Sequence, residues 1–540
     1  MDWKIKPQKS PDLIEQLLLN RGLKTKKQVE DFFNPKLSDF EKNLKIPGIG
    51  QAKKRIEQAI KNEELIIAYG DYDVDGICGA AILYLGLTAI GAKVLPYIPH
   101  REKEGYGLSV TGLDFARDSG ASLVITTDTG IVSFEMAEYC KKLGLDLIIT
   151  DHHQKEGKKL PKALVIVHSI ELCGAAVTWC LVRSLLSALI KSESEQKANE
   201  FLDLIAIATV ADMMPLLGVN RALVKEGLKV LNKTERVGLK TLIYNSKLDL
   251  GKITSFEIGH IIAPQLNAMG RLEHAIDSLR LLCTKDPAKA AKLVDLVAAT
   301  NSQRRLLTQQ AVEEARIMIK EEKNIYLLSS KDWNPGIIGL VAGRVVEETR
   351  KPAIIISEGA VHSKGSARSI NGLNIVELIR SSADILVAVG GHTGAAGFTI
   401  ATENIVEFKK RMEGKMVTAE FLEEPVLEIE AEVPAKLINL TLLKKLSDFE
   451  PFGVGNQKPI LITHKIQLSD LRTVGGGLPA GRQGKHLKGR ADGIDFIAFN
   501  KGSLLKILQN GQLVDLAYFL DIDTYGGFEK VQLNIRDIKL

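Results

Sequence analysis

The sequence is poor in several kinds of residue that would place it in a specialised class of protein. Its 540 residues include only five cysteines, with no Cys-x-x-Cys pair, so neither a disulfide framework nor a zinc ribbon is indicated. Lys plus Arg exceed Asp plus Glu by 71 to 66, too little to indicate nucleic-acid binding by itself. The 45% hydrophobic and 25% charged residues exclude wholesale disorder and fibrous repeats.

Targeting and membrane segments are also missing from the pattern. The lysines of the first nine residues precede no apolar stretch of signal-peptide length. The longest nearly apolar run, 77–92, contains three glycines and follows three aspartates, so we interpret it as a buried helix. The cysteines are then expected to be reduced, mostly buried thiols of a cytoplasmic protein: Cys78, Cys140, Cys173, Cys180 and Cys283.

At roughly 100 to 200 residues per domain, this length predicts several domains. Between 64 and 210, short apolar runs alternate with helical patterns, which predicts a parallel α/β sheet. From Pro287 to Glu322 no Gly or further Pro occurs, which predicts one long helix. A second, smaller α/β pattern and then short strands with Gly-rich turns follow, the latter typical of a β-barrel. The expected parts are an accessory segment (1–48), an α/β domain (49–275), a connecting helix (276–322), a smaller α/β domain (323–415) and a β domain (424–540).

Acidic residues follow the first predicted strand of the large α/β domain. Asp71, Asp73 and Asp75 would share one face of an extended chain, and three close carboxylates repel one another unless a cation neutralises them. A calcium loop or a solvated acidic turn is the alternative. An EF-hand, however, needs a twelfth-position acid, and here an apolar helix follows at once.

Further polar residues follow the next strands. Asp128-Thr129-Gly130, Asp151-His152-His153 and Asp212 each come after an apolar run. Each alone is compatible with helix capping or a surface position. Together they place carboxylates and imidazoles along one edge of the sheet. Such a ligand set suits Mn²⁺ or Mg²⁺, and two such ions suit displacement at phosphorus, so the pattern predicts a two-metal phosphoesterase.

The order of these motifs resembles the DHH phosphoesterase superfamily and, within it, the RecJ family of single-stranded-DNA exonucleases. Supporting segments are Glu104 to Leu108, Leu266 to Leu272, Lys364 to Ser369 and Gly390-Gly391-His392. The resemblance runs from about residue 60 to 400, and the C-terminal strands resemble the family's OB-fold. It implies a DHH-type parallel-sheet domain, a connecting helix, a smaller DHH-associated α/β domain and an OB-like β-barrel.

The resemblance also implies roles for individual residues. Asp128 would bridge two Mn²⁺ or Mg²⁺ ions, Asp71 would support them, and His153 would contact the scissile phosphate. The metal ligands would be Asp73, Asp75, Asp128, His152 and Asp212. The DNA-binding cleft, which should admit one strand but not a duplex, would be lined by Arg101, Tyr106, Arg271, Ser366, Arg368 and His392.

For two of these cleft residues a simpler role stays open: Tyr106 would be plain packing, and Arg271 would pair with a carboxylate. In the β domain, basic residues occur without an acid between Leu471 and Ala491. They predict a basic loop that tracks single-stranded DNA, with a solvated charged face as the alternative. These residues are Arg472, Arg482, Lys485, Lys488 and Arg490.

The sequence departs from the family pattern at His100, His168-Ser169, Gln265 and Asn334, and 475–484 looks like a loop insertion. None of these positions is a proposed metal ligand.

The expected function is a metal-dependent exonuclease acting on single-stranded DNA, and the resemblance alone implies its 5′ to 3′ polarity and its place in recombination and repair. The enzyme would be a monomer whose partners include a single-strand-binding protein or a helicase. One alternative is a phosphodiesterase of short oligonucleotides or cyclic dinucleotides, whose relatives generally lack the barrel. A manganese pyrophosphatase would have His in place of Tyr69. A non-catalytic replication scaffold on the same fold predicts damaged metal motifs, whereas all five ligands are present here.

Overall fold

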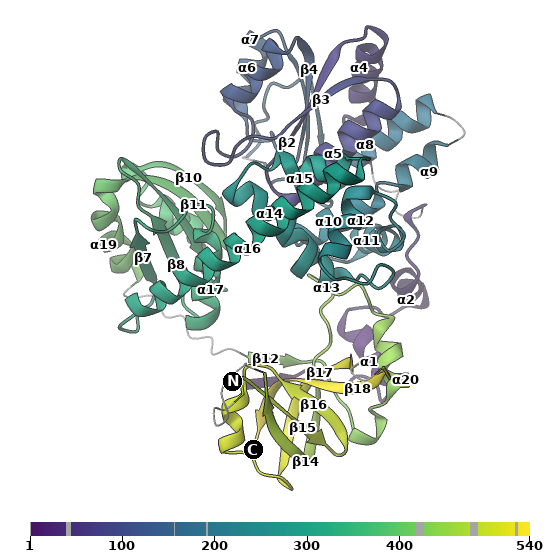
Figure 1. Cartoon of the computed structure of the whole chain (residues 1–540), viewed down its shortest axis with the longest axis vertical. Helices are drawn as coiled ribbons and strands as arrows, with labels where there is room; N and C mark the ends of the chain where they lie inside the picture. The colour runs from purple at the N-terminus through teal and green to yellow at the C-terminus, as the bar shows by residue number, and fades with distance from the viewer. Residues whose placement is uncertain are drawn as a thin grey trace. The chain divides into compact units, whose positions relative to one another are not determined.

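The chain forms two compact units in the computed structural model, which describes residues 2–38, 45–155, 157–190, 193–416, 426–475, 484–523 and 527–540. One unit combines Met1–Asn43, Pro215–Lys225 and Glu423–Leu540, and the other combines Leu44–Met214 and Glu226–Leu422 (Figure 1). None of the helices in the described part of the chain has the length and apolar character needed to cross a bilayer. The five cysteines are free thiols.

A five-stranded parallel sheet lies at the centre of the α/β domain. Its strand order is β3-β2-β4-β5-β6. The apolar runs 65–69, 123–127, 145–150 and 163–167 predict strands and form β2, β4, β5 and β6. Strand β3 was missed because its sequence contains Pro and Lys and is only partly buried. The strands are β2 (Leu65–Gly70), β3 (Lys93–Tyr97), β4 (Ala121–Thr127), β5 (Asp146–Asp151) and β6 (Val165–His168).

Helices cover both faces of this sheet (Figure 1). The predicted buried helix is α5, and two of its glycines allow close packing. A Cβ on Gly79 would lie 2.0 Å from Thr127 Oγ1 of β4, and one on Gly86 would lie 2.3 Å from Val182 of α8. On the other face, α6 and α7 pack on Ile67, Val124 and Ile149. The helices are α4 (Ile49–Lys61), α5 (Val74–Ala89), α6 (Val110–Asp118), α7 (Phe134–Lys142), α8 (Gly174–Leu189), α9 (Ser194–Asn199) and α10 (Leu202–Ala211).

The predicted long helix is α16, Pro287–Met318, which has 32 residues and is four residues shorter than expected at its end. Asp286 caps its start, since its carboxylate accepts hydrogen bonds from the backbone N–H groups of Ala288 and Lys289. The helices before it are α11 (Gly218–Leu231), α12 (Val237–Asn245), α13 (Ser255–Glu257), the π-helix η1 (Ile258–Ile262), α14 (Ala263–Leu272) and α15 (Ile276–Cys283).

The second sheet is mixed, with the order β10-β11-β9-β8-β7, and only β7 and β8 are parallel. Apolar runs at 325–328, 353–356 and 385–389 predict strands, and these form β7, β8 and β10. Strands β9 and β11 were missed because small, Gly-containing segments show no continuous apolar run. The elements are β7 (Tyr326–Ser330), α17 (Ile338–Thr349), β8 (Ala353–Ser357), β9 (His362–Arg368), α18 (Ile375–Arg380), η2 (Ala383–Ile385), β10 (Leu386–His392), β11 (Ala395–Ala401), η3 (Thr402–Asn404) and α19 (Ile405–Met416).

The other unit is built on a barrel, which closes because β14 pairs with both β15 and β17. The N-terminal segment belongs to this unit, where β1 (Asp2–Ile5) pairs in parallel with β12 (Val426–Ile429), and α1 (Leu13–Asn20) and α2 (Lys26–Phe33) add to the core. The remaining elements are β13 (Ala431–Glu432), η4 (Ala435–Leu437), α20 (Leu440–Ser447), β14 (Leu461–Val474), β15 (His486–Ala491), β16 (Ile494–Ala498), η5 (Gly502–Lys506), β17 (Leu513–Asp523) and β18 (Lys530–Lys539).

Candidate metal centre and active site

The acidic segment after β2 makes a tight turn into α5. Asp73 is the N-cap of this helix, and its Oδ1 accepts hydrogen bonds from the N–H groups of Asp75 (3.0 Å) and Gly76 (3.1 Å). A Cβ on Gly76 would lie 2.5 Å from the backbone nitrogen of Asp71, so only glycine fits there. The expectation that the three aspartates share one face of an extended chain is therefore wrong, because the helix already begins at Val74.

Asp75 points instead toward the start of α8. Its two carboxylate oxygens accept hydrogen bonds from the N–H groups of Gly174 (2.6 Å) and Ala175 (2.8 Å). A helix N-terminus favours negative charge, so α8 stabilises this buried carboxylate. Gly174 also packs directly against the next acidic residue, since a Cβ there would lie 2.5 Å from the Cβ of Asp128.

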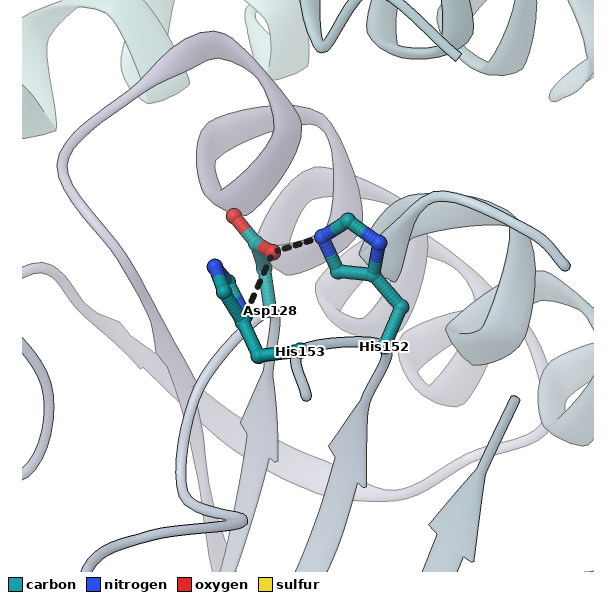
Figure 2. A group of neighbouring side chains, drawn as sticks. All are labelled: Asp128, His152 and His153. Carbon is teal, nitrogen blue, oxygen red and sulfur yellow. Dashed lines mark ion pairs between the residues drawn. The ribbon is translucent and has the colours of Figure 1, made fainter. Parts of the chain in front are cut away.

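Asp128 lies at the centre of the cluster and follows β4. Its backbone is in the left-handed region, at φ 63°, a conformation that Asp tolerates better than most residues. Figure 2 shows the imidazoles of His152 and His153 directed at its carboxylate. His152 Nε2 lies 3.1 Å, and His153 Nδ1 3.8 Å, from Asp128 Oδ1.

Asp151, the last residue of β5, holds the two histidines in place. Its carboxylate accepts hydrogen bonds from the backbone N–H groups of Ile131 (2.9 Å), His152 (2.7 Å) and His153 (3.1 Å), and it lies 2.8 Å from His153 Nδ1. These bonds and the charge of His153 keep the pKa of Asp151 below its usual value despite burial. Sequence reasoning gave Asp151 no role of its own, although its adjacency to the two histidines was a signal.

The ligand atoms fall into three overlapping groups, within each of which the atoms lie within 4.8 Å of one another. Asp128 and His152 each belong to two groups, so the cluster is continuous. The five predicted metal ligands, with Asp71 and His153, are thereby brought together, and Asp71 belongs to the same group as Asp128 and Asp73. The groups are Asp71, Asp73 and Asp128; Asp75, His152 and Asp212; and Asp128, His152 and His153.

Burial and mutual repulsion make the cluster electrostatically unfavourable by itself. Burial, with the neighbouring aspartates, raises the pKa values of Asp71 and Asp128 well above the usual value and that of Asp212 to about 8. Burial lowers the pKa of His152. Burial opposes protonation of His153 too, but the hydrogen bond to Asp151 and the surrounding carboxylates raise its pKa to about 9. So many carboxylates ionise together only when cations balance them.

Divalent cations fit this arrangement. Asp71 Oδ1, Asp128 Oδ1 and His152 Nε2 are buried and have no hydrogen-bond partner in the described part of the chain. Buried polar atoms normally have partners, so these three are directed as ligands would be. A set of carboxylates with one or two imidazoles suits Mn²⁺ or Mg²⁺.

A pocket of about 560 Å³ lies in the same unit, lined by residues that follow β2 and β3 of the parallel sheet and by residues of β9, β10 and β11. Three of the six predicted cleft residues, Arg101, Tyr106 and Ser366, are among its lining, and Arg101 lies over the Tyr72 ring at 4.9 Å. His392, exposed at the end of β10, is not part of the lining. The pocket is open beside Gly390, which lines it, because a Cβ on Gly390 would meet no atom within 4 Å.

Four arginines form a positive cluster beside these residues. Burial, with the charges of Arg101, Arg304 and Arg368, lowers the pKa of the Arg271 guanidinium to about 9. Arg271 donates a hydrogen bond to the Gly336 carbonyl (3.2 Å) and, within the described residues, makes no ion pair with a carboxylate. Crowded arginines of which the central one, Arg271, has no ion-pair partner in the described part of the chain favour a bound anion. Arg304 was missed, because inside the uniform pattern of α16 nothing distinguishes it from its neighbours.

The positions that depart from the family pattern take structural roles. Asn334 Oδ1 accepts a hydrogen bond from Gly336 N (2.7 Å), Gln265 donates to Ser246 Oγ (2.8 Å), and His100 packs edge-on to the ring of His274. His168 Nε2 lies 2.7 Å from the carbonyl oxygen of His153. None of these contacts disturbs the metal cluster.

The sequence predicts that the basic residues of the barrel lie together on a loop. The structure shows that they do not. Lys488 and Arg490 are on β15 and Arg472 on β14, and among the described members of this set Lys485 alone lies outside a strand. Arg490 pairs with Asp495 at 3.2 Å, its register partner on β16, and Lys488 lies 3.8 Å from Asp523 of β17, because the barrel brings acids from other strands beside these bases. Arg482 and most of the 475–484 segment lie outside the described residues.

The two sheets, the metal cluster and the barrel define a protein of the DHH type. Family models match the chain as the DHH family N-terminal domain at residues 65–209, the DHHA1 domain at 321–418 and the RecJ OB domain at 429–537. The predicted fold class is thereby confirmed.

Full-length comparisons are more specific. The single-stranded-DNA-specific exonuclease RecJ of Bacillus subtilis is 34% identical over 543 residues, which cover 97% of this chain and 67% of that protein. RecJ of Salmonella typhimurium is 30% identical, with 98% of this chain and 96% of that protein covered. The crystal structure of RecJ in complex with Mn²⁺ from Thermus thermophilus matches with a TM-score of 0.85 and 28% identity, over 100% of this chain and 79% of that one. The chain belongs to the RecJ family.

Proposed function

We propose that the chain is a metal-dependent exonuclease that hydrolyses phosphodiester bonds of single-stranded DNA from the 5′ end, in recombination and repair. The observation that carries the proposal is the Asp and His cluster around Asp128, which occurs in the same compact unit as a pocket lined by Arg101, Tyr106 and Ser366. The names of the RecJ relatives support the substrate. The polarity and the pathway rest on family membership.

Metal ligands and DNA contacts have distinct tasks in this proposal. Two divalent cations, Mn²⁺ or Mg²⁺, would neutralise the carboxylates, activate water and stabilise charge on the phosphate. They would be held by Asp73, Asp75, Asp128, His152 and Asp212, with Asp71 as a supporting carboxylate beside Asp73 and Asp128.

The remaining residues bind and orient the strand. The guanidinium groups of Arg101, Arg271 and Arg368 attract backbone phosphates, and the Ser366 hydroxyl supplies a further donor. Tyr106 is 49% exposed, so the face of its ring can stack on an unpaired base. The hydrogen bond to Asp151 and the surrounding carboxylates raise the pKa of His153 to about 9, so the positive charge of its imidazole attracts the scissile phosphate.

The barrel would extend the contact with the strand. OB-folds bind single strands along basic, aromatic surfaces, and Arg472, Lys485, Lys488 and Arg490 supply positive charge there. Because Lys488 and Arg490 form ion pairs with acidic residues, they contribute less of the positive charge that would attract the strand. We also propose that the chain has the five parts expected from its sequence and that His392 contacts DNA. The protein would be a cytoplasmic monomer, and a helicase or a single-strand-binding protein would present the strand to it.

The test compares substrates and variants in one assay. The purified protein is incubated with Mn²⁺ and single-stranded DNA labelled at the 5′ or 3′ end, and with duplex and short-oligonucleotide substrates. Asp128→Ala removes a central ligand, and Asp249→Ala, an exposed acid paired with Lys252, is the matched control. We expect rapid mononucleotide release from the 5′ label on single strands, unchanged in Asp249→Ala and lost in Asp128→Ala.

Other outcomes would redirect the proposal. Cleavage of short oligonucleotides alone would indicate a phosphodiesterase of small substrates. Release from the 3′ label would reverse the polarity. No metal-dependent cleavage of any substrate would favour a non-catalytic scaffold.

A further inference from the structure

The phenol of Tyr106 contacts two parts of the metal cluster at once. Its hydroxyl oxygen lies 3.3 Å from the carbonyl oxygen of Asp128, and 3.2 Å and 3.1 Å from Nδ1 and Nε2 of His153. The ring of Tyr106 meets the His153 ring nearly edge-on, with centroids 5.7 Å apart. One side chain therefore joins the backbone of the central carboxylate to the imidazole beside it.

The directions of these hydrogen bonds follow from the partners. A carbonyl oxygen only accepts, so the phenol proton is donated to Asp128. The Asp151 carboxylate also only accepts, so His153 Nδ1 donates to it at 2.8 Å. The phenol oxygen lies at nearly equal distances from the two ring nitrogens, 3.2 Å from Nδ1 and 3.1 Å from Nε2. The His153 imidazole therefore contacts both the Asp151 carboxylate and the Tyr106 phenol.

Glycines on both sides of Tyr106 fix the backbone conformation of this residue. Gly105 and Gly107 have φ angles of 87° and 83°, in the region that favours glycine, and a Cβ on Gly107 would lie 2.9 Å from Thr129 Oγ1. The segment thus packs tightly on the loop that carries Asp128. The exposed ring face and the engaged hydroxyl are separate features, and stacking on DNA needs only the first.

We propose that Tyr106 is a positioning residue, whose hydroxyl fixes the His153 imidazole and the Asp128 backbone for hydrolysis. The inference rests on the proposed function, because it assigns a task within that reaction. It differs from a role in DNA stacking alone, which a phenylalanine would fulfil equally well.

The test removes the hydroxyl and then asks whether its effect depends on His153. Tyr106→Phe, His153→Gln and the double variant are compared with the unaltered full-length protein by single-turnover cleavage of single-stranded DNA in Mn²⁺. Tyr139→Phe is the matched control, since it removes a phenol that binds Asp114 at 2.9 Å on the surface. Circular dichroism and the melting temperature establish that each variant folds.

We expect Tyr106→Phe to lower the maximal cleavage rate about tenfold, the loss of one hydrogen bond, with the DNA concentration at half-maximal rate changed less than about twofold. In the His153→Gln background the further loss should fall to less than about twofold. A tenfold loss in both backgrounds, a normal Tyr106→Phe, or an effect confined to DNA affinity would each overturn the inference. If Tyr106→Phe does not fold, the ¹⁵N resonances of His153 in Tyr106→Gln are compared with the unaltered protein, and unshifted resonances would overturn it too. An unaltered protein that cleaves no DNA would instead refute the proposed function.

Discussion

His168 Nε2 lies 2.7 Å from the carbonyl oxygen of His153, so an imidazole at the end of β6 supports the backbone that carries the imidazole beside the metal cluster. In the parallel sheet, His168 is the register partner of Asp151. Because a carbonyl oxygen only accepts, His168 donates through Nε2. This contact crosses from an edge strand to the catalytic segment.

Removing this donor should reduce cleavage without removing metal binding. We expect His168→Ala to lower the rate about three- to tenfold, because a partly buried carbonyl loses its partner, while His168→Asn, which keeps a donor, should lose less. Single-turnover cleavage and Mn²⁺ titration measure both effects. The matched control is His260→Ala, which removes another contact between an imidazole and a carbonyl, to Phe256 at 3.0 Å. Equal losses in His168→Ala and His260→Ala would contradict this role.

Much of the metal centre could be predicted because parallel strands end at a common edge. Asp71, Asp128 and Asp151 follow or end β2, β4 and β5, which are adjacent in the sheet, and continuous apolar runs mark such strands in the sequence. The supporting contacts could not be predicted in this way. The N–H groups that bind Asp75 come from Gly174 and Ala175, about a hundred residues away, and a lone glycine at a helix start carries no signal of that partner.

Some strands could not be predicted from the sequence for a different reason. The β9 and β11 segments contain Gly, Ser and Ala and pair with each other. They form strands because they pair with neighbouring strands, more than because of an apolar run of their own. The same holds for β15, where alternating basic residues were interpreted as a loop. Its inward positions, Leu487 and Ala491, are buried in the barrel, a period of two that the charged residues obscured.

Gly174→Ala should disrupt the metal centre without adding charge or polarity. Its Cβ would lie 2.5 Å from the Cβ of Asp128, so either α8 or Asp128 must shift, and both position carboxylates. We expect Mn²⁺ affinity to fall about tenfold or more, measured by calorimetric titration. Gly343→Ala is the control, because a Cβ there meets no atom within 4 Å. In helix α17 that change should stabilise the fold by roughly 0.5–1 kcal/mol. Unchanged Mn²⁺ binding in Gly174→Ala would show that the site tolerates the displacement.

The metal-free protein should become less stable as pH rises toward 8. The pKa of Asp212 is raised to about 8 by burial and by Asp75 and Asp73, so between about pH 4 and pH 8 the folded protein binds a proton that the unfolded chain releases, and stability falls with rising pH. His153, with a pKa of about 9, acts in the same direction. Its stabilisation is complete below its unfolded value of about 6.5 and is lost as pH rises through 9.

Melting temperatures in EDTA between pH 5 and pH 8.5 measure this effect, which we expect to be a few degrees. Asp212→Asn should remove part of the slope, whereas Asp249→Asn, an exposed acid, should keep it. Excess Mn²⁺ should flatten or reverse the slope, because metal ligands bind in their deprotonated form. A slope that is identical in the unaltered protein and Asp212→Asn would contradict the raised pKa of Asp212.

Arg304 should bind DNA phosphate although its helix has no binding motif. Its charge is one of three that lower the pKa of Arg271, and Asn301 Oδ1 accepts a hydrogen bond from its Nε at 3.1 Å, which orients the guanidinium. We expect Arg304→Met to weaken binding of single-stranded DNA uniformly across sequences and to reduce the slope of log affinity against log salt by about 0.7, the value for one phosphate contact on a single strand. Fluorescence anisotropy at several salt concentrations with Ca²⁺ in place of Mn²⁺ measures both. Arg305→Met, the exposed neighbour on α16, changes the net charge equally. If the two variants show the same slope, Arg304 acts only through net charge and not as a phosphate contact.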